Sequence, residues 1–278
     1  MSIIKNIDIF IFCPIINSTK EQEIIMDIRL DGRIALITGA TGGIGSAITN
    51  EFFHSGATVI INGRSQEKID ALTDKLLTGG DKKDAARIFG VAMDLSALDS
   101  ETVIIQRAIE KFKKLDILVN NAGMVDGNLM MVSNPEFVSR MMLINYEKPY
   151  QLTRNALYYM RKARYGRIIN ITSVSGQFGD AGLSVYASSK AAMHALSQSI
   201  AAEYGRYNIT ANSIAPGVVD TDAIKKMREE YKQDTKKLIP CHRFAKTNEI
   251  ADLATFLASE RAAYINGQQI AINGGLYR

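Results

Sequence analysis

A tyrosine and a lysine four residues apart are the side chains in this sequence best suited to acid–base chemistry. They are Tyr186 and Lys190, at the head of an apolar-periodic segment. On a helix, residues i and i+4 lie on one face, so the phenol and the ammonium are expected to be neighbours. A free tyrosine has a pKa near 10, and a nearby ammonium lowers that pKa towards neutrality. Ser173 follows an apolar run and could hydrogen-bond a substrate carbonyl, so the three residues predict a proton-transfer site.

A glycine-rich turn supplies a second chemical feature. Thr38-Gly39-Ala40-Thr41-Gly42-Gly43-Ile44-Gly45 follows a short apolar run and precedes an amphipathic one. Glycines let the backbone turn tightly and approach a pyrophosphate, whose charge then lies at a helix N-terminus. The spacing departs from the commonest G-x-G-x-x-G, because Ile48 stands where the last glycine of a motif begun at Gly43 would be. We therefore predict a dinucleotide site, with an ordinary strand-to-helix turn as the alternative.

The residue at the end of the second predicted strand should indicate whether the cofactor is NAD or NADP. An acidic residue there binds the ribose of NAD, whereas an arginine accommodates the 2′-phosphate of NADP. The sequence Asn62-Gly63-Arg64-Ser65 contains no carboxylate and one guanidinium, which can bind a phosphate with two hydrogen bonds. We predict NADPH/NADP as the cofactor; the alternative is that Arg64 is an ordinary solvated loop residue.

Short β-type runs alternate with longer helix-type segments from Arg33 onward. This order predicts an α/β fold, a single Rossmann-type doubly wound parallel sheet of about seven strands with helices on both faces. The predicted strands are Ile34–Thr38, Thr58–Asn62, Ile88–Ala92, Ile117–Val119, Arg167–Thr172, Thr210–Ala215 and Gln269–Ile272. The predicted helices are Ile44–Ser55, Gln66–Leu77, Ser100–Phe112, Pro135–Lys162, Ser188–Tyr204 and Asn248–Ala258. The charged segment Thr221–Lys237 falls between two strands, where an insert could cover a ligand.

These motifs together resemble those of the short-chain dehydrogenase/reductase family, over a stretch from about Leu30 to Tyr277. The resemblance is carried by the following motifs: Thr38-Gly39-x-x-x-Gly43-x-Gly45, Asn120-Asn121-Ala122-Gly123, Asn145, Ser173, Tyr186-x-x-x-Lys190 and Pro216-Gly217. It implies that Tyr186 gives the carbonyl its proton and that Lys190 lowers the Tyr186 pKa while binding the nicotinamide ribose. Ser173 is implied to orient the substrate, and Asn145 to hold a water of the proton relay.

The same resemblance implies where the cofactor lies. Asp94 and Leu95 are expected to flank the adenine, Asn121 to line the cleft, and Pro216 and Thr221 to meet the nicotinamide end. The full set of predicted cofactor-binding residues is Gly39, Thr41, Gly43, Ile44, Gly45, Arg64, Asp94, Leu95, Asn121, Ala122, Gly123, Tyr186, Lys190, Pro216, Gly217, Val219 and Thr221.

Within the family, the chain is most similar to bacterial 3-oxoacyl-[acyl-carrier-protein] reductases. This similarity implies NADPH-dependent reduction of a 3-oxoacyl thioester in fatty acid synthesis, an acyl carrier protein as partner, a homotetramer, and Thr221–Lys237 as a substrate lid. Gly42 departs from these reductases, which often carry a basic residue there, and Leu183-Ser184-Val185 departs from their more polar stretch before the tyrosine. The alternative is a reductase or dehydrogenase for another carbonyl or alcohol, such as a coenzyme A thioester, a sugar or a polyol.

Composition narrows the remaining classes of function. The chain has 278 residues, of which 46% are hydrophobic and 22% charged, as in soluble globular proteins. Its 33 basic and 29 acidic residues are interspersed and do not indicate nucleic-acid binding. Two cysteines, Cys13 and Cys241, predict no disulfide framework and a reducing, cytoplasmic location. The three histidines lack the spacing of a metal site, so no metal is predicted.

Two stretches permit more than one interpretation. Ile3–Ile16 is apolar but interrupted and too short to span a membrane, so we predict residues 1–25 to be a poorly ordered extension before a reductase domain at residues 26–278. A targeting or membrane-tethering role is the alternative.

The cations Arg161, Lys162, Arg164 and Arg167 could attract an acidic carrier protein, or could simply complement a helix C-terminus.

Overall fold

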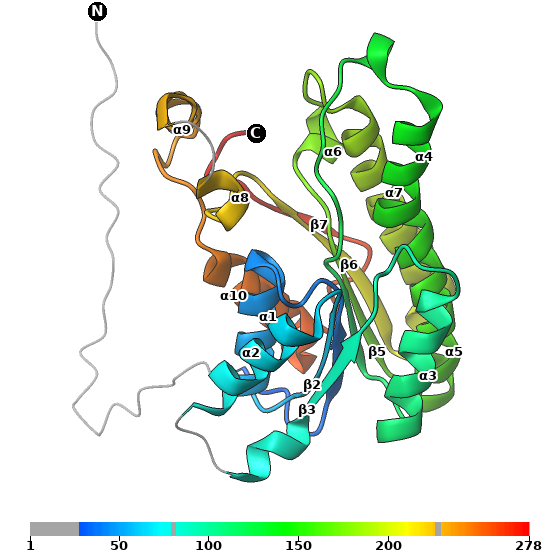
Figure 1. The fold of residues 1–278 in the computed structure, drawn as a ribbon. Coiled ribbons are helices and arrows are strands. Elements are labelled where there is room, and N and C mark those ends of the chain that lie inside the picture. The colour runs from blue at the N-terminus through cyan, green and yellow to red at the C-terminus, as the bar shows by residue number, and fades with distance from the viewer. Residues whose placement is uncertain (1–27, 79–81, 226–228, 278) are drawn as a thin grey trace, which may run out of the picture.

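Seven parallel strands form one sheet with the order β3-β2-β1-β4-β5-β6-β7 (Figure 1). The computed structural model describes residues 28–78, 82–225 and 229–277. The strands are β1 (Ile34–Ile37), β2 (Thr58–Gly63), β3 (Ile88–Ala92), β4 (Ile117–Asn120), β5 (Gly166–Ile171), β6 (Ile209–Pro216) and β7 (Gln269–Ile272). The central strands are apolar on both faces because helices cover both sides of the sheet. The predicted fold class is confirmed.

Each face of the sheet packs against its own set of helices (Figure 1). One face is covered by α1 (Gly43–His54), α2 (Gln66–Leu77) and α10 (Thr247–Ala258), which bury residues such as Phe52 and Ile69. The other face is covered by α3 (Ser100–Phe112), α5 (Lys148–Ala163) and α7 (Ser184–Tyr204). Among the described helices, none combines the length and the apolar character that crossing a membrane requires.

The order of the strands creates a crevice at one edge of the sheet. The chain builds β1, β2 and β3 outward in one direction and then returns to place β4 on the other side of β1. The loops that leave β1 and β4 therefore diverge to opposite faces, which opens a crevice beyond the carboxyl ends of these two strands. The glycine-rich turn follows β1, and Asn121 follows β4, so both lie at this crevice.

Two predicted helices differ from the structure in detail. The long helix predicted over Pro135–Lys162 consists of α4 (Pro135–Met142), a π-helical turn (Leu143–Glu147) and α5. The apolar periodicity continues across this turn, so the pattern does not reveal the extra residue. The helix predicted to begin at Ser188 begins at Ser184, which places Tyr186 inside its first turn.

The remaining described helices are short. They are α6 (Ser175–Phe178), α8 (Asp222–Lys225) and α9 (Glu229–Leu238). The predicted lid Thr221–Lys237 thus contains α8 and α9, and its residues 226–228 lie outside the described residues. The predicted extension, residues 1–25, also lies outside them.

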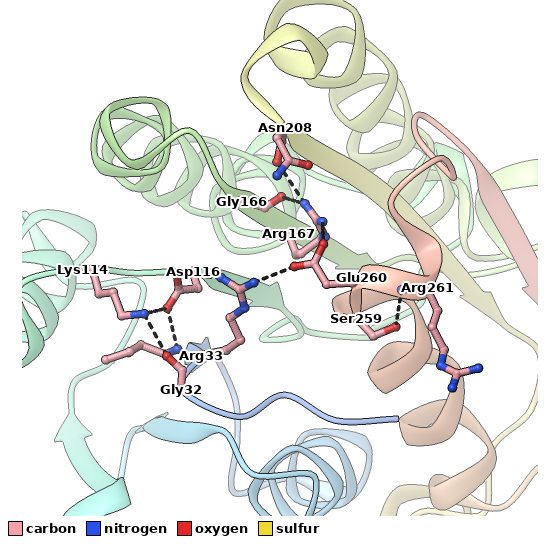
Figure 2. Close-up of polar contacts among 11 residues, drawn as sticks. Gly32, Arg33, Lys114, Asp116, Gly166, Arg167, Asn208, Ser259, Glu260 and Arg261 are labelled. Carbon is pink, nitrogen blue, oxygen red and sulfur yellow. Dashed lines mark hydrogen bonds and ion pairs between the residues drawn. The ribbon is translucent and has the colours of Figure 1, made fainter. Parts of the chain in front are cut away.

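A polar network joins the amino ends of the strands, on the edge opposite the crevice (Figure 2). Arg167 on β5 has no exposed surface and donates to Glu260 at 3.1 Å, and Arg33 donates to the same carboxylate at 2.6 Å. The guanidinium groups of both arginines also stack on the Tyr165 ring, at 3.6 Å for Arg33 and 4.4 Å for Arg167. Arg167 therefore belongs to the core, and the docking alternative is wrong for this one of the four cations.

Candidate active site

A cleft of about 640 Å³ lies beyond the carboxyl ends of β1, β2, β3 and β4. Most of the predicted cofactor-binding residues line it: Gly39, Thr41, Gly43, Ile44, Gly45, Arg64, Asp94, Leu95, Asn121, Ala122, Gly123 and Thr221. These residues come from segments far apart in the sequence, and the parallel sheet brings them to one edge. Its position at the reversal of strand order is where α/β proteins of this type bind ligands.

The glycine turn is packed too tightly to admit side chains at two of its positions. A Cβ atom at Gly45 would lie 2.2 Å from the Gly39 carbonyl oxygen, and one at Gly39 would lie 2.9 Å from the Ala122 Cα atom. Gly39 also has a φ of +61°, which favours glycine. The N-cap residue of α1 is Gly42, so no side chain caps the backbone N–H groups at the start of this helix. The first residues of the helix line the cleft. This backbone cradle fits a pyrophosphate group.

Hydrogen bonds from Asn121 attach this turn to the end of β4. The Asn121 amide group donates to the carbonyl oxygens of Thr38 and Gly39 at 3.0 and 3.1 Å. The Thr38 hydroxyl accepts from the backbone N–H groups of Asn121 and Ala122. Asn121 therefore lines the cleft as expected, and its amide group holds the two walls of the crevice together.

Two cations lie at the end of the cleft where β2 meets α2. Arg64 lines this end, as predicted, and Lys68 on the first turn of α2 lines it as well. Asp94 lies close enough to Arg64 for the guanidinium to lower the pKa of its carboxyl, although hydrogen bonds from Ser96 contribute more. Sequence reasoning missed Lys68, although its place in the first turn of the helix that follows Arg64 was a usable signal.

Asn145 projects from the π-helical turn into the protein interior and is 1% exposed. Its amide oxygen accepts from the Met124 backbone N–H at 2.8 Å, and its amide nitrogen donates to the Met124 carbonyl at 3.0 Å. The same nitrogen donates to the Ser189 hydroxyl at 3.1 Å. The side chain thus fixes the segment after β4 against α7, and the predicted water-holding role stays a prediction.

The predicted pair Tyr186 and Lys190 lies buried on α7, next to the cleft. The Lys190 ammonium donates to the Ile171 carbonyl at 2.9 Å and stands 5.8 Å from the centre of the Tyr186 ring. A Cβ atom placed on Gly123 would lie 3.3 Å from the Lys190 nitrogen, so this ammonium borders the cleft wall. Lys190 therefore adjoins the cleft at Gly123, although neither Tyr186 nor Lys190 is among the residues that line it, and their binding of a cofactor stays a prediction.

Burial dominates the ionisation of both groups. Burial raises the pKa of the Tyr186 phenol, a hydrogen bond from Ser173 opposes this, and the negative charge of Asp180 adds to it. Burial lowers the pKa of Lys190 to about 8. Lys190 is not among the groups that shift the Tyr186 pKa, so the expected lowering of this pKa by Lys190 stays a prediction. Tyr186 is therefore a protonated phenol at neutral pH, which suits a proton donor.

Apolar side chains pack against Tyr186. Phe137 and Met141 of α4 form a buried cluster with Tyr186. Met124, Leu183 and Val185 pack against this cluster and are partly exposed. Leu183 and Val185 come from the stretch that departs from the more polar sequence of similar reductases, and the structure makes them part of an apolar wall beside the proton donor.

The remaining predicted residues follow β6. Pro216 ends β6, and Gly217 packs so closely that a Cβ atom there would lie 3.0 Å from the Asn273 Cα atom. Val219 is buried and pairs with Ala245. Thr221 reaches the glycine turn, because a Cβ atom at Gly43 would lie 2.9 Å from its methyl group. Of these residues, Thr221 lines the cleft, whereas Pro216, Gly217 and Val219 are not among the residues that line it.

Comparison with known proteins agrees with this geometry. A family model described as enoyl-(acyl carrier protein) reductase matches residues 39–277. The chain belongs to the short-chain dehydrogenase/reductase family. One relative in this family, the 3-oxoacyl-[acyl-carrier-protein] reductase of Aquifex aeolicus, is 36% identical over 252 residues, which cover 91% of this chain and 100% of the relative. Nodulation protein G of Rhizobium meliloti is 38% identical over 249 residues, with coverages of 89% and 98%.

A solved structure extends the comparison to three dimensions. The crystal structure of a proposed gluconate dehydrogenase from Agrobacterium tumefaciens matches with a TM-score of 0.85 and 29% identity, covering 90% of this chain and 98% of that one. As a short-chain dehydrogenase/reductase, the protein is an oxidoreductase, and membership of this family implies a nicotinamide cofactor. The glycine cradle, the cleft and the buried Lys190 are consistent with that cofactor.

Proposed function

We propose that this protein uses NADPH to reduce a 3-oxoacyl thioester, carried by an acyl carrier protein, to the 3-hydroxyacyl thioester. The observation that carries the proposal is the position of Tyr186, whose ring stands 5.8 Å from the Lys190 ammonium and packs in an apolar cluster with Phe137 and Met141. An acyl chain can bury its surface against such a cluster without leaving polar groups unpaired. The names of the reductase relatives support the same substrate class.

In the proposed reaction each residue has a defined task. The cradle at Gly39 and Gly45 and the first turn of α1 hold the pyrophosphate, and Arg64 and Lys68 hold the 2′-phosphate. A reduced nicotinamide bound in the cleft supplies the hydride. Tyr186 donates the proton to the carbonyl oxygen, and the Ser173 hydroxyl, which lies within hydrogen-bond reach of the phenol, turns to donate its one hydrogen bond to that same oxygen. Lys190 is placed to bind the nicotinamide ribose.

The proposed gluconate dehydrogenase among the structural relatives makes an anionic sugar acid the second candidate substrate. Two features favour the thioester instead. Sugar hydroxyls need polar partners, whereas Met124, Phe137 and Leu183 are apolar. The negative charge of Asp180 acts on Tyr186, and this charge would repel a carboxylate bound beside the phenol but not a neutral thioester.

A substrate panel tests the proposal. We expect acetoacetyl-coenzyme A, a small thioester mimic, to be reduced with oxidation of NADPH, and gluconate not to be oxidised with either NADP or NAD. A carrier-bound acetoacetyl group should give a lower KM than the coenzyme A thioester. Turnover of gluconate without turnover of either thioester would replace the proposal by the second candidate.

Arg64 provides a prediction about the choice of cofactor. Replacing Arg64 by Gln should raise the KM for NADPH by about 10- to 100-fold, since a charge-assisted contact to a phosphate contributes roughly 1.5–3 kcal/mol. The KM for NADH should not change, because NADH lacks the 2′-phosphate. Lys75→Gln, which removes a cation from the opposite end of α2, is the matched control. Equal effects on NADPH and NADH would remove Arg64 from the phosphate site.

The basic residues at the end of α5 are not assigned a docking role. Lys162 donates to the Tyr158 hydroxyl at 2.7 Å, and Arg164 stacks on Tyr207. Arg164 donates to the carbonyl of Arg206, which follows the C-terminal end of α7. Tyr186 lies at the opposite, N-terminal end of this helix, which is roughly 30 Å long. These contacts and this separation favour the alternative that the cations complement the end of a helix.

A further inference from the structure

A chain of hydrogen bonds leads from the candidate catalytic serine to the last residues of the protein. The Ser173 hydroxyl accepts from the Ser175 backbone N–H at 3.2 Å. The Ser175 hydroxyl donates in a short hydrogen bond to one carboxylate oxygen of Asp180. The Tyr277 hydroxyl donates to the other oxygen of Asp180 at 2.8 Å. Residues 97 positions apart are thereby connected beside the site.

Ring stacking reinforces this connection. Tyr277 lies parallel to Phe178, with ring centres 4.6 Å apart and an angle of 14° between the planes. Phe178 ends the short helix α6, which begins at Ser175, two residues after Ser173. The tail is itself held after β7, because Asn273 donates to the Tyr277 carbonyl at 3.1 Å. Tyr277 therefore contacts the loop between β5 and α7 through both its ring and its hydroxyl.

This loop carries the parts of the site that would meet the substrate. It begins next to Ser173 and ends at Leu183 and Val185, which pack against Tyr186. Gly179 and Gly182 in the loop have φ values of +72° and +80°, so its course depends on glycine and on the contacts that anchor it. The side chain of Asp180 lies between these glycines and accepts hydrogen bonds from two different segments.

We propose that Asp180 and Tyr277 are positioning residues that hold Ser173 and the loop at residues 174–183 in place for the substrate carbonyl. The inference rests on the proposed function, in which Ser173 orients that carbonyl. Asp180 has a second effect, since its charge favours the protonated form of Tyr186. The Lys190 ammonium, on the same helix, stands 5.8 Å from the centre of the Tyr186 ring, and α4 presents the apolar Phe137 and Met141.

Two conservative variants distinguish the positioning of the loop by Tyr277 from the effect of the Asp180 charge on Tyr186. Tyr277→Phe keeps the ring stacked on Phe178 and removes only the hydroxyl. We expect kcat/KM for the thioester to fall about three- to ten-fold, the value of one neutral hydrogen bond, with the NADPH affinity unchanged. Hydrogen exchange in residues 174–183 should become faster. Tyr264→Phe, which removes a fully exposed hydroxyl from another loop, is the control and should change none of these values.

Asp180→Asn removes the charge. We expect the pKa of Tyr186 to fall, which moves the alkaline limb of the pH profile for reduction to lower pH. The same ionisation can be followed without any substrate through the ring-carbon resonance of isotope-labelled tyrosine, assigned with Tyr186→Phe. Faster exchange in Tyr277→Phe with unchanged kcat/KM would mean a merely structural brace and would overturn the proposal.

A protein that reduces no thioester would refute the proposed function but not this inference. In that case the inference is decided by the exchange rates and the tyrosine resonance alone. Faster exchange in Tyr277→Phe together with a lowered Tyr186 pKa in Asp180→Asn supports it. Unchanged values in both variants overturn it.

Discussion

Replacing Tyr186 by Phe is expected to lower kcat for thioester reduction by about 10²- to 10⁴-fold, the contribution typical of a general acid. The variant keeps the ring that packs against Phe137 and Met141 and loses only the hydroxyl, so the apolar cluster should stay intact. The steady-state rate of NADPH oxidation in the presence of acetoacetyl-coenzyme A measures the loss.

Cofactor affinity distinguishes a chemical effect from a structural one. NADPH binding, followed by the fluorescence of the reduced nicotinamide, should be close to that of the unchanged protein in Tyr186→Phe. Tyr150→Phe, at a tyrosine on α5 that is 44% exposed, is the matched control for loss of a hydroxyl and should retain full activity. A Tyr186→Phe protein with near-native turnover would show that another group donates the proton.

Replacing Lys190 by Met should combine a large loss of activity with an altered dependence of stability on pH. The ammonium borders the cleft at Gly123 and lies on the same helical face as Tyr186, so its removal should lower kcat/KM by at least about 10²-fold. Methionine has a similar length and no charge, which suits a buried position. Lys190→Arg should not restore activity, because a guanidinium has a different shape and donor geometry.

The stability effect follows from the lowered pKa of Lys190. Its folded-state pKa of about 8 lies below the ordinary value of 10.5, so between these pH values the unfolded chain binds the proton and the folded protein does not. The free energy of unfolding should therefore rise with pH across this window, by up to about 3 kcal/mol, and the Lys190→Met protein should lack this rise. Urea unfolding at pH 7 and at pH 10 measures the difference. Parallel pH dependences in the two proteins would contradict the burial of a titrating ammonium.

Sequence patterns were sufficient to predict the site residues that directly follow the strands. The glycine turn follows β1, Arg64 follows β2, Asp94 follows β3 and Asn121 follows β4. Once alternating elements predict a parallel sheet, these residues must meet at its carboxyl edge, and they line one cleft. Tyr186 and Lys190 were predictable as well, because residues four apart on a helix lie on the same face.

Features that depend on tertiary contacts were not predictable in this way. The π-helical turn at Leu143–Glu147 was not predicted, and neither were the two hydrogen bonds that join Asn145 to the Met124 backbone 21 residues away. Arg167 looked like part of a surface cluster because its partner, Glu260, is 93 residues away. The raised pKa of Tyr186 reflects burial by α4, which residue spacing on α7 cannot indicate.

The transfer of deuterium from labelled NADPH to the substrate tests the central claim most directly. The protein is incubated with acetoacetyl-coenzyme A and NADPH that carries deuterium at the reactive carbon of the nicotinamide, in both stereochemical forms, and the product is analysed by mass spectrometry. The account predicts a 3-hydroxybutyryl thioester with one deuterium at carbon 3 from one of the two forms, and no such product with Tyr186→Phe at matched times. A reduced product without deuterium from either form, or no reduced product at all, would contradict it.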